Sequence, residues 1–390
     1  MIKETFKFKL FYFIRYFGDA LFYPFMSLYF ISKGVTEAEL GLILAITPIA
    51  TILVNPVWNF LARDMRAIRV ILKVMTLIEG ILIIVVTQIS GFELYALVIC
   101  LIAMLCSPFI SIQDGFTATF ANQNNIEYTS IRIHASIAYV VASAIAGLVI
   151  VYLGYTVLFV VAGMMFILTM LIAFWIKPLK DELQRQNAPQ RDIKALLRNR
   201  EFYKYLIFYT LMVGAVRVGD SFFGVYMTGV KGLDATQYGF LYAAFILAEV
   251  IVIRVLINKG QLISERKLMI ISALLFALRF VAYSFIDDSV ALSVITILRG
   301  IAWGIFLFAN IRYIMKIVKV ENVTPAIMII TLLFSVFTAV GNFLFGRFVN
   351  NMGYSWLYLI LAGIIGLGFV VILVLSPKIT YENDAISSNE

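Results

Sequence analysis

Long, uninterrupted apolar runs dominate the sequence, and short polar or Pro/Gly-containing stretches separate them. Each run is close to the ~20 residues that an α-helix needs to cross the hydrocarbon of a bilayer. The runs are continuous and do not alternate in polarity, so they favour helices over the strands of a membrane barrel. The chain is also 62% hydrophobic and only 14% charged, which places it outside the range of soluble globular domains.

We therefore predict an all-α, polytopic membrane protein with twelve transmembrane helices. The first run follows three lysines, but it is too long for a signal peptide and lacks a small-residue cleavage site, so we interpret it as a retained span. The predicted spans are residues 10–32, 39–61, 70–90, 93–119, 129–153, 155–176, 204–229, 237–257, 268–286, 289–317, 326–350 and 354–376.

The longest polar interruption runs from Lys177 to Tyr205, between the sixth and seventh spans. It divides the chain into two six-helix bundles. A short amphipathic helix at residues 192–198, lying on the membrane surface, is an alternative to a fully solvated linker. The predicted domains are an N-terminal bundle (1–176), a cytoplasmic linker (177–203), a C-terminal bundle (204–377) and a cytoplasmic tail (378–390).

Basic residues gather in alternate loops, as Arg63, Arg66 and Arg69 do after the second span. The positive-inside rule then places both termini in the cytoplasm of a multi-pass protein of the cell inner (plasma) membrane, surrounded by lipid. The net charge of +8 is mostly this topological signal, and no basic-aromatic pattern indicates nucleic-acid binding. Cys100 and Cys106 are expected to be free thiols. We expect a monomer without metal or cofactor.

A short pattern recurs about half a chain apart. The first span carries Asp19 and is followed by KGVTEAELG, and the seventh carries Asp220 and is followed by KGLDATQYG. The two aspartates lie 201 positions apart. Transporter folds are often built from repeated helix bundles, so we predict two pseudo-symmetric halves. The two halves also carry a charged residue at the corresponding depth but with opposite signs, Glu79 in the third span and Arg279 in the ninth.

Ten ionisable residues fall inside the predicted spans. At about 2.5–3.5 kcal/mol per charge, exposing all of them to lipid would cost on the order of 25–35 kcal/mol. That exceeds the ~5–15 kcal/mol net stability of a typical fold, so they must face one another or a water-filled cavity. Buried salt bridges that only fix helix packing are the alternative. The ten are Arg15, Asp19, Glu79, Asp114, Arg132, Arg217, Asp220, Glu249, Arg279 and Arg299.

One stretch, DGFTATFANQNNIEYTSIRIHASIAY, places Asp114 eighteen positions before Arg132. Further along, LAEV contains Glu249, LRF contains Arg279 and ILRGIAWGIF contains Arg299. In these features, and in the loop PVWNFLARD, the sequence resembles the major facilitator superfamily, and within it the group around lactose permease and the phenylpropionate permease-like carriers. The resemblance covers nearly the whole chain and implies a fold of two six-helix bundles.

The resemblance also implies roles for particular residues. Asp114 and Arg132 stand where lactose permease binds its sugar, and Glu249 stands where an acid takes part in proton coupling. The loop PVWNFLARD is similar to one that holds the two halves together in one conformation. Candidate solute-binding residues are Asp114, Arg132, Asp19, Arg15, Asp220, Arg217, Arg299 and Asn310; candidate proton-coupling residues are Glu249, Asp19, Asp220, Glu79 and Arg279; candidate gating-loop residues are Asp64, Arg63 and Arg69.

We expect a proton-coupled symporter that imports a small polar solute by alternating access, with a saccharide or nucleoside ahead of an aromatic acid. A proton-driven exporter of drugs or metabolites is the alternative, because five acidic against five basic residues in the spans fix no sign for the substrate. A remote alternative is an intramembrane aspartyl protease that uses Asp19 and Asp220. The glycines of its signature, a metal-binding HExxH and a serine elbow are missing from the sequence, so we expect no enzyme activity.

Overall fold

The computed structural model describes residues 2–62, 64–177, 179, 196, 198–260, 263–319 and 322–374. Within these ranges the regular secondary structure is helical and contains no strand, so the predicted all-α architecture is confirmed. The helices are α1 (Ile2–Ser32), α2 (Glu37–Leu61), α3 (Met65–Val86), α4 (Phe92–Cys106), α5 (Phe109–Gln123), α6 (Tyr128–Trp175), α8 (Arg200–Val225), η1 (Tyr226–Val230), α9 (Ala235–Lys259), α10 (Glu265–Phe285), α11 (Ser289–Ile317) and α12 (Val323–Val374).

Eight helical stretches in the described part of the chain are long and apolar enough to cross a membrane. They comprise α2, α4 together with α5, α6, α8 together with η1, α9, α10, α11 and α12. Helices α1 and α3 are not among the eight, and both carry buried charges: Arg15 and Asp19 on α1, and Glu79 on α3.

Two of these stretches each join two of the predicted spans. Helix α6 contains 129–153 and all but the last residue of 155–176, and α12 contains 326–350 and most of 354–376. Each has one residue with non-helical backbone angles, Gly154 at φ 81° and Gly353 at φ 78°. Positive φ is readily adopted only by glycine, so each glycine ends one helical segment and lets the chain reverse into the next. The predicted span boundaries at these positions are confirmed.

The predicted span 93–119 lies within one apolar stretch, Phe92–Gln123, that is long enough to cross a membrane, but its helix is broken. The structure divides it into α4 and α5 at Ser107 and Pro108. Proline has no backbone N–H to donate and its ring crowds the preceding turn, so a helix that enters Pro108 from the N-terminal side is interrupted there.

The recurring loop sequences adopt the same local structure. Thr36 begins α2 with a capping box, in which its side chain accepts a hydrogen bond from the Glu39 amide and the Glu39 side chain accepts one from the Thr36 amide. Asp234 and Gln237 form the same reciprocal pair at the start of α9. A capping box satisfies two backbone donors that the first helical turn leaves free, so the repeat preserves the signal that starts both helices.

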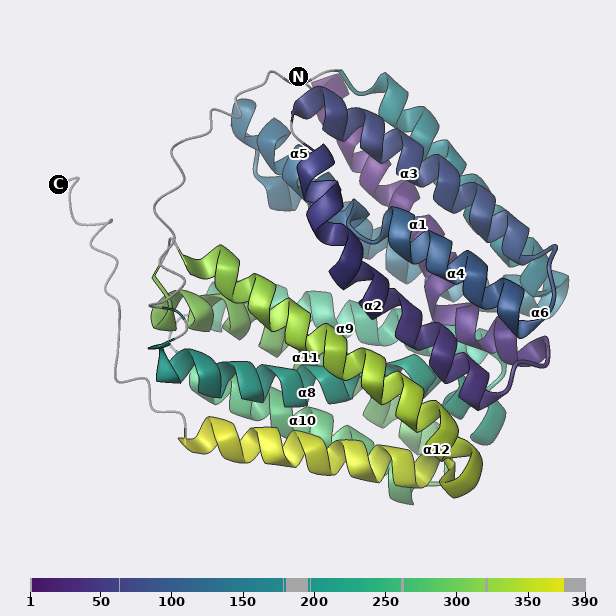
Figure 1. Ribbon diagram of the computed structural model, residues 1–390, viewed down its shortest axis with the longest axis vertical. Coiled ribbons are helices and arrows are strands. Elements are labelled where there is room, and N and C mark those ends of the chain that lie inside the picture. The colour runs from purple at the N-terminus through teal and green to yellow at the C-terminus, as the bar shows by residue number, and fades with distance from the viewer. Residues whose placement is uncertain are drawn as a thin grey trace.

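Figure 1 shows most helices of the first half of the chain in the upper part of the view and those of the second half in the lower part. In the first half α6 packs on α1 and α3, and α2 on α4; in the second half α12 packs on α8 and α10, and α11 on α9 and α10. The halves meet through α2 against α12, α6 against α9, and α1 against α8.

Two of these crossings are close enough to require glycine. A Cβ atom on Gly346 of α12 would lie 2.7 Å from the Cα atom of Gly41 on α2. A Cβ atom on Gly147 of α6 would lie 2.7 Å from the Cα atom of Thr236 on α9. Small residues allow membrane helices to approach backbone to backbone, so the two halves are in contact at two related places.

Candidate functional site

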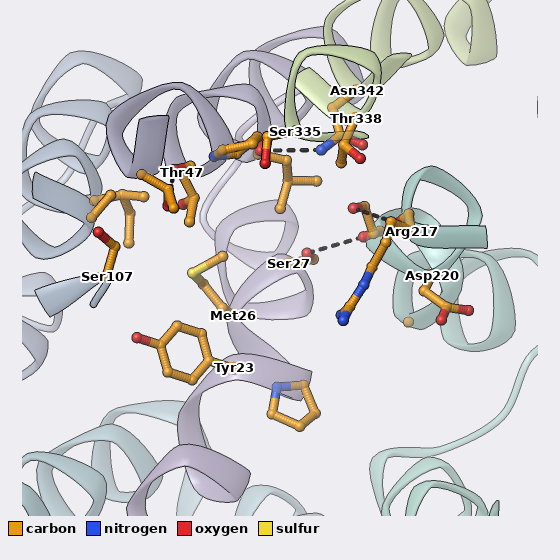
Figure 2. A pocket seen from close by; sticks show the side chains of 18 of the residues that line it. Tyr23, Met26, Ser27, Thr47, Ser107, Arg217, Asp220, Ser335, Thr338 and Asn342 are labelled. Carbon is orange, nitrogen blue, oxygen red and sulfur yellow. Dashed lines mark hydrogen bonds between the residues drawn. The ribbon is translucent and has the colours of Figure 1, made fainter. Parts of the chain in front are cut away.

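A cavity of about 470 Å³ lies between the two halves of the chain. Its walls come from α1, α2 and α4 of the first half and from α8, α9, α11 and α12 of the second, with Ser107 at the end of α4 (Figure 2). The volume falls in the range of small-molecule sites, ~300–1,000 Å³. Residues such as Leu44, Ile99, Ile102 and Phe334 make much of the wall apolar.

Three charged side chains line this cavity, all from the second half: Arg217, Asp220 and Arg299. Both oxygens of the Asp220 carboxylate are occupied, because Arg279 donates to Oδ1 at 2.8 Å and Arg299 donates to Oδ2 at 2.9 Å. Arg279 is fully buried, and its guanidinium lies 4.5 Å from the centre of the Phe280 ring. We call Asp220, Arg279 and Arg299, together with Arg217 and Glu249, the C cluster.

Arg217 differs from the other arginines of the C cluster. Its guanidinium lies 5.2 Å from the centre of the Trp303 ring, and among the described residues it has no ion-pair partner within 4 Å. Figure 2 shows its side chain extending from α8 into the space beside α1, while Asp220 of the same helix points another way. Glu249 interacts electrostatically with Arg299, Arg217 and Arg132, without a close ion pair in the described part of the structure.

A second group, the N cluster, consists of Arg15, Asp19 and Glu79. Arg15 donates from Nη1 to Asp19 at 2.5 Å and from Nη2 to Glu79 at 3.0 Å. The three residues are only 3%, 4% and 0% exposed, so one guanidinium and two carboxylates are enclosed together. Tyr23 donates its hydroxyl to Glu79 at 2.8 Å and lines the cavity, which connects the N cluster to the cavity.

Asp114 and Arg132 form a third, more open group. Arg132 Nε lies 3.5 Å from Asp114 Oδ2, and Tyr12 donates its hydroxyl to Asp114 at 2.7 Å. The Arg132 and Asp114 side chains are 45% and 28% exposed. Neither residue is in the cavity wall. The ten charges of the spans therefore occupy three groups instead of one common surface.

The remaining candidate residues lie away from the cavity wall. Asn310 accepts a hydrogen bond from Tyr205 within the second half. Asp64 caps α3 by accepting from the Ala67 amide at 2.7 Å, and Arg69 donates to the carbonyl of Phe174 at 2.9 Å, so both contacts stay within the first half. Arg63 and most of the amphipathic helix expected at 192–198 lie outside the described residues.

Three polar cavity residues on α12 that precede Asn342 were not identified from the sequence: Thr331, Ser335 and Thr338. Thr331, Ser335, Thr338 and Asn342 follow at spacings of four, three and four residues, which places them on one helix face. Asn342 donates to the carbonyl of Leu44 on α2, and so joins the halves beside the cavity (Figure 2). This periodicity is visible in the sequence, but attention to charges alone misses it.

The described residues offer no group of three His, Cys, Asp or Glu side chains arranged to hold a metal ion. Cys100 and Cys106 are free.

These features match those of a known group of transporters. A family model described as "MFS_1 like family" matches residues 5–360. The chain belongs to this family. The predicted membership of the major facilitator superfamily is thereby confirmed, and with it the expectation of a membrane transporter and not an enzyme.

Two relatives in sequence are transporters of different named substrates. A maltose permease of Geobacillus stearothermophilus is 24% identical over 356 residues, covering 89% of this chain and 86% of the permease. A probable 3-phenylpropionic acid transporter of Escherichia coli (strain K12) is 25% identical over 280 residues, covering 69% of this chain and 71% of that transporter.

Solved structures show the same fold. A crystal structure of the nucleoside transporter NupG superimposes with a TM-score of 0.79 at 16% identity, over 95% of this chain and 98% of NupG. A bacterial homologue of the human lysosomal transporter Spinster, inward-facing and unoccupied, superimposes with a TM-score of 0.68 at 13% identity, over 96% of this chain and 95% of that one. At these identities the likeness concerns the fold alone.

Proposed function

We propose that this protein is a proton-coupled symporter with twelve spans in two six-helix bundles, which imports a small organic solute by alternating access. The helices support twelve spans. Helices α6 and α12 count as two spans each, divided at Gly154 and Gly353, and α1 and α3 add to the eight apolar stretches. The basic loops support a cell-membrane location with both termini in the cytoplasm.

The observation that carries the proton coupling is the charge of the N cluster. Two carboxylates share one guanidinium in a site that is at most 4% exposed, so the cluster bears one surplus negative charge. Holding an unpaired charge inside a membrane protein costs about 2.5–3.5 kcal/mol. Binding one proton at Glu79 or Asp19 removes that cost. In the described part of the chain the other ionisable groups that interact with the site include Tyr23, Cys106, Tyr16 and Tyr139.

The connection through Tyr23 supports coupling between proton and solute. Tyr23 is 40% exposed on the cavity side while its hydroxyl holds Glu79, so a solute in the cavity touches a residue bonded to the proton site. The two glycine crossings support alternating access, because each joins the halves at a narrow contact about which they can separate.

The solute is a saccharide, a nucleoside or an aromatic acid, the classes expected from the sequence. Three similar proteins are named after solutes of these classes: the maltose permease, the probable 3-phenylpropionic acid transporter and the nucleoside transporter NupG. Its entry in symport with one proton would be driven by both the pH gradient and, for a neutral solute, the membrane potential.

Proteoliposomes containing the purified protein test the proposal. An imposed inward proton gradient should drive uptake of a labelled solute from a panel of these three classes above its external concentration, and Glu79→Gln should abolish accumulation. Efflux driven by the same gradient, or accumulation that survives Glu79→Gln, would reject proton-coupled import.

A further inference from the structure

The C cluster carries the opposite charge to the N cluster. Its three arginines, Arg217, Arg279 and Arg299, face two carboxylates, Asp220 and Glu249, which leaves one surplus positive charge. The Asp220 carboxylate already accepts from two arginines, so its hydrogen-bonding capacity toward guanidinium groups is largely used. The surplus therefore resides at Arg217, which stacks on the Trp303 ring and has no ion-pair partner within 4 Å among the described residues.

Arg217 is placed to meet a solute. It lines the cavity, projects into it, and is classed with the exposed residues although the neighbouring Val216 and Val218 are buried (Figure 2). A guanidinium presents donors in a planar fork that fits a carboxylate with two parallel hydrogen bonds. The stacked Trp303 ring restricts that fork, which lowers the entropy lost when a carboxylate binds.

One part of the cavity wall, beside the polar residues of α12, fits an apolar body. Ile99, Ile102 and Leu44 line the cavity from the first half, Arg217 lines it from the second half, and Phe334 adds an aromatic side chain from α12. The hydroxyl groups of a neutral sugar would lose hydrogen bonds to water wherever they faced these apolar side chains.

We propose that the cavity binds an organic monocarboxylate with an apolar body, anchored by Arg217, and that the carboxylate crosses the membrane with one proton in electroneutral symport. This rests on the proposed function, because it uses the same cavity and proton site. With both ligands bound, the proton neutralises the N cluster and the carboxylate neutralises the C cluster. With both absent, the surplus charges of the two clusters cancel across the cavity. A phosphate ester dianion would leave a negative surplus, and a neutral solute a positive one.

Binding to the purified full-length protein tests the anchor by isothermal titration calorimetry. The probes are benzoate, 3-phenylpropionate and octanoate, each beside its matched amide, with phenyl phosphate, maltose and uridine as comparators. We expect at least one carboxylate to bind about tenfold or more tightly than its amide. Arg217→Gln should weaken that carboxylate roughly 10- to 100-fold and leave the amide within about threefold, because a charged hydrogen-bonding partner is lost.

Two further variants separate charge from fold. Arg217→Lys keeps the charge without the fork and should show an intermediate loss. Arg347→Gln is the matched control, since Arg347 is also exposed and stacks on an aromatic ring, Phe343 at 4.4 Å, but lies outside the cavity wall; it should bind like the parent. Equal affinity for acid and amide, tighter binding of phenyl phosphate, no binding of any of the three carboxylates, or no effect of Arg217→Gln would each overturn the anchor.

Transport in proteoliposomes tests the electroneutral step. A potential of 100 mV, inside negative, without a pH gradient should drive no carboxylate accumulation, whereas a neutral solute moving with one proton would accumulate up to about fiftyfold. If maltose or uridine accumulates in this way and Arg217→Gln does not matter, the inference fails while the proposed function stands. If carboxylates bind through Arg217 but no proton gradient moves them, the anion site stands while the proposed symport fails.

Discussion

The substitution Glu79→Gln separates the structural role of the N cluster from its role in coupling. The glutamine amide can still accept the Tyr23 hydrogen bond, and the Arg15–Asp19 ion pair at 2.5 Å remains as a neutral unit. Replacing a carboxylate that accepts from Arg15 costs about 1.5–3 kcal/mol. Removing the surplus buried charge returns about 2.5–3.5 kcal/mol. The two effects largely cancel, so the free energy of unfolding should change by no more than about 2 kcal/mol.

Arg15→Leu is the contrasting variant, because it leaves Asp19 and Glu79 enclosed together without a cation. Removing one partner of a buried ion pair costs about 3–5 kcal/mol, so this variant should lose most of its thermal stability or fail to accumulate in the membrane. Thermal unfolding of both variants in the same detergent measures the difference.

Glu79→Gln should completely abolish the accumulation of solute that a proton gradient drives. A pH gradient of one unit is worth about 1.4 kcal/mol and supports about a tenfold solute gradient at one proton per solute. With its proton site permanently neutral, Glu79→Gln should equilibrate the solute to a ratio of about one, yet still exchange labelled for unlabelled solute across the membrane. A tenfold gradient in this variant, or loss of exchange together with accumulation, would show that the N cluster is not the coupling site.

Three further outcomes follow from the structure. Tyr23→Phe removes the hydrogen bond between the cavity wall and the N cluster. It should slow proton-driven uptake, lower the free energy of unfolding by about 1 kcal/mol, and leave solute affinity within about threefold in calorimetry. Unchanged uptake would contradict coupling between the cavity and the N cluster through Tyr23. A leucine side chain at position 346 cannot fit against α2, so Gly346→Leu should abolish transport in proteoliposomes while solute binding persists. At Gly363 an added Cβ atom would meet nothing within 4 Å, so the control Gly363→Leu should transport like the parent. Glu265 is the first residue of α10 and precedes the predicted span 268–286. Burial alone would raise its pKa, but the hydrogen bond from Lys316 and the nearby positive charges outweigh burial and lower the pKa below its ordinary 4.5. A lowered folded-state pKa means that the stabilisation is present above pH ~4.5 and is lost as the pH falls through the folded-state pKa. Glu265→Gln should therefore reduce the fall of thermal stability with pH below about 4.5, and an unchanged fall would contradict this.

The helical plan and the ends of most helices were predictable because they depend on local chemistry. Gly154 and Gly353 predict where the chain reverses between two helical segments, because glycine readily adopts positive φ. The capping pairs predict the starts of α2 and α9. The break inside 93–119 was predictable too, since Pro108 stands at its centre. Long apolar composition outweighed that single residue in the sequence analysis.

The partners of the charges were not predictable, because they come from distant helices. Asp220 finds Arg299 across 79 positions, and Tyr23 finds Glu79 across 56. Helical spacing shows that Arg15 and Asp19 share a face, but only the packing of α1 on its neighbours shows that the pair is enclosed and that Arg217 faces a cavity. The division of ten charges into clusters of opposite surplus sign therefore requires the structure.

We propose that the two halves open the cavity to each side of the membrane in turn. Distances between pairs of spin labels, one pair at each end of the helix bundles, measure this opening and closing. One pair of labels, at Ala38 on α2 and Asn350 on α12, reports on the end with the glycine crossing; a second pair, at Arg66 on α3 and Lys319 after α11, reports on the opposite end. With both native cysteines replaced, solute and proton should lengthen the first distance in the same population in which the second shortens. Two distances that stay fixed, or that lengthen together, would contradict alternating access.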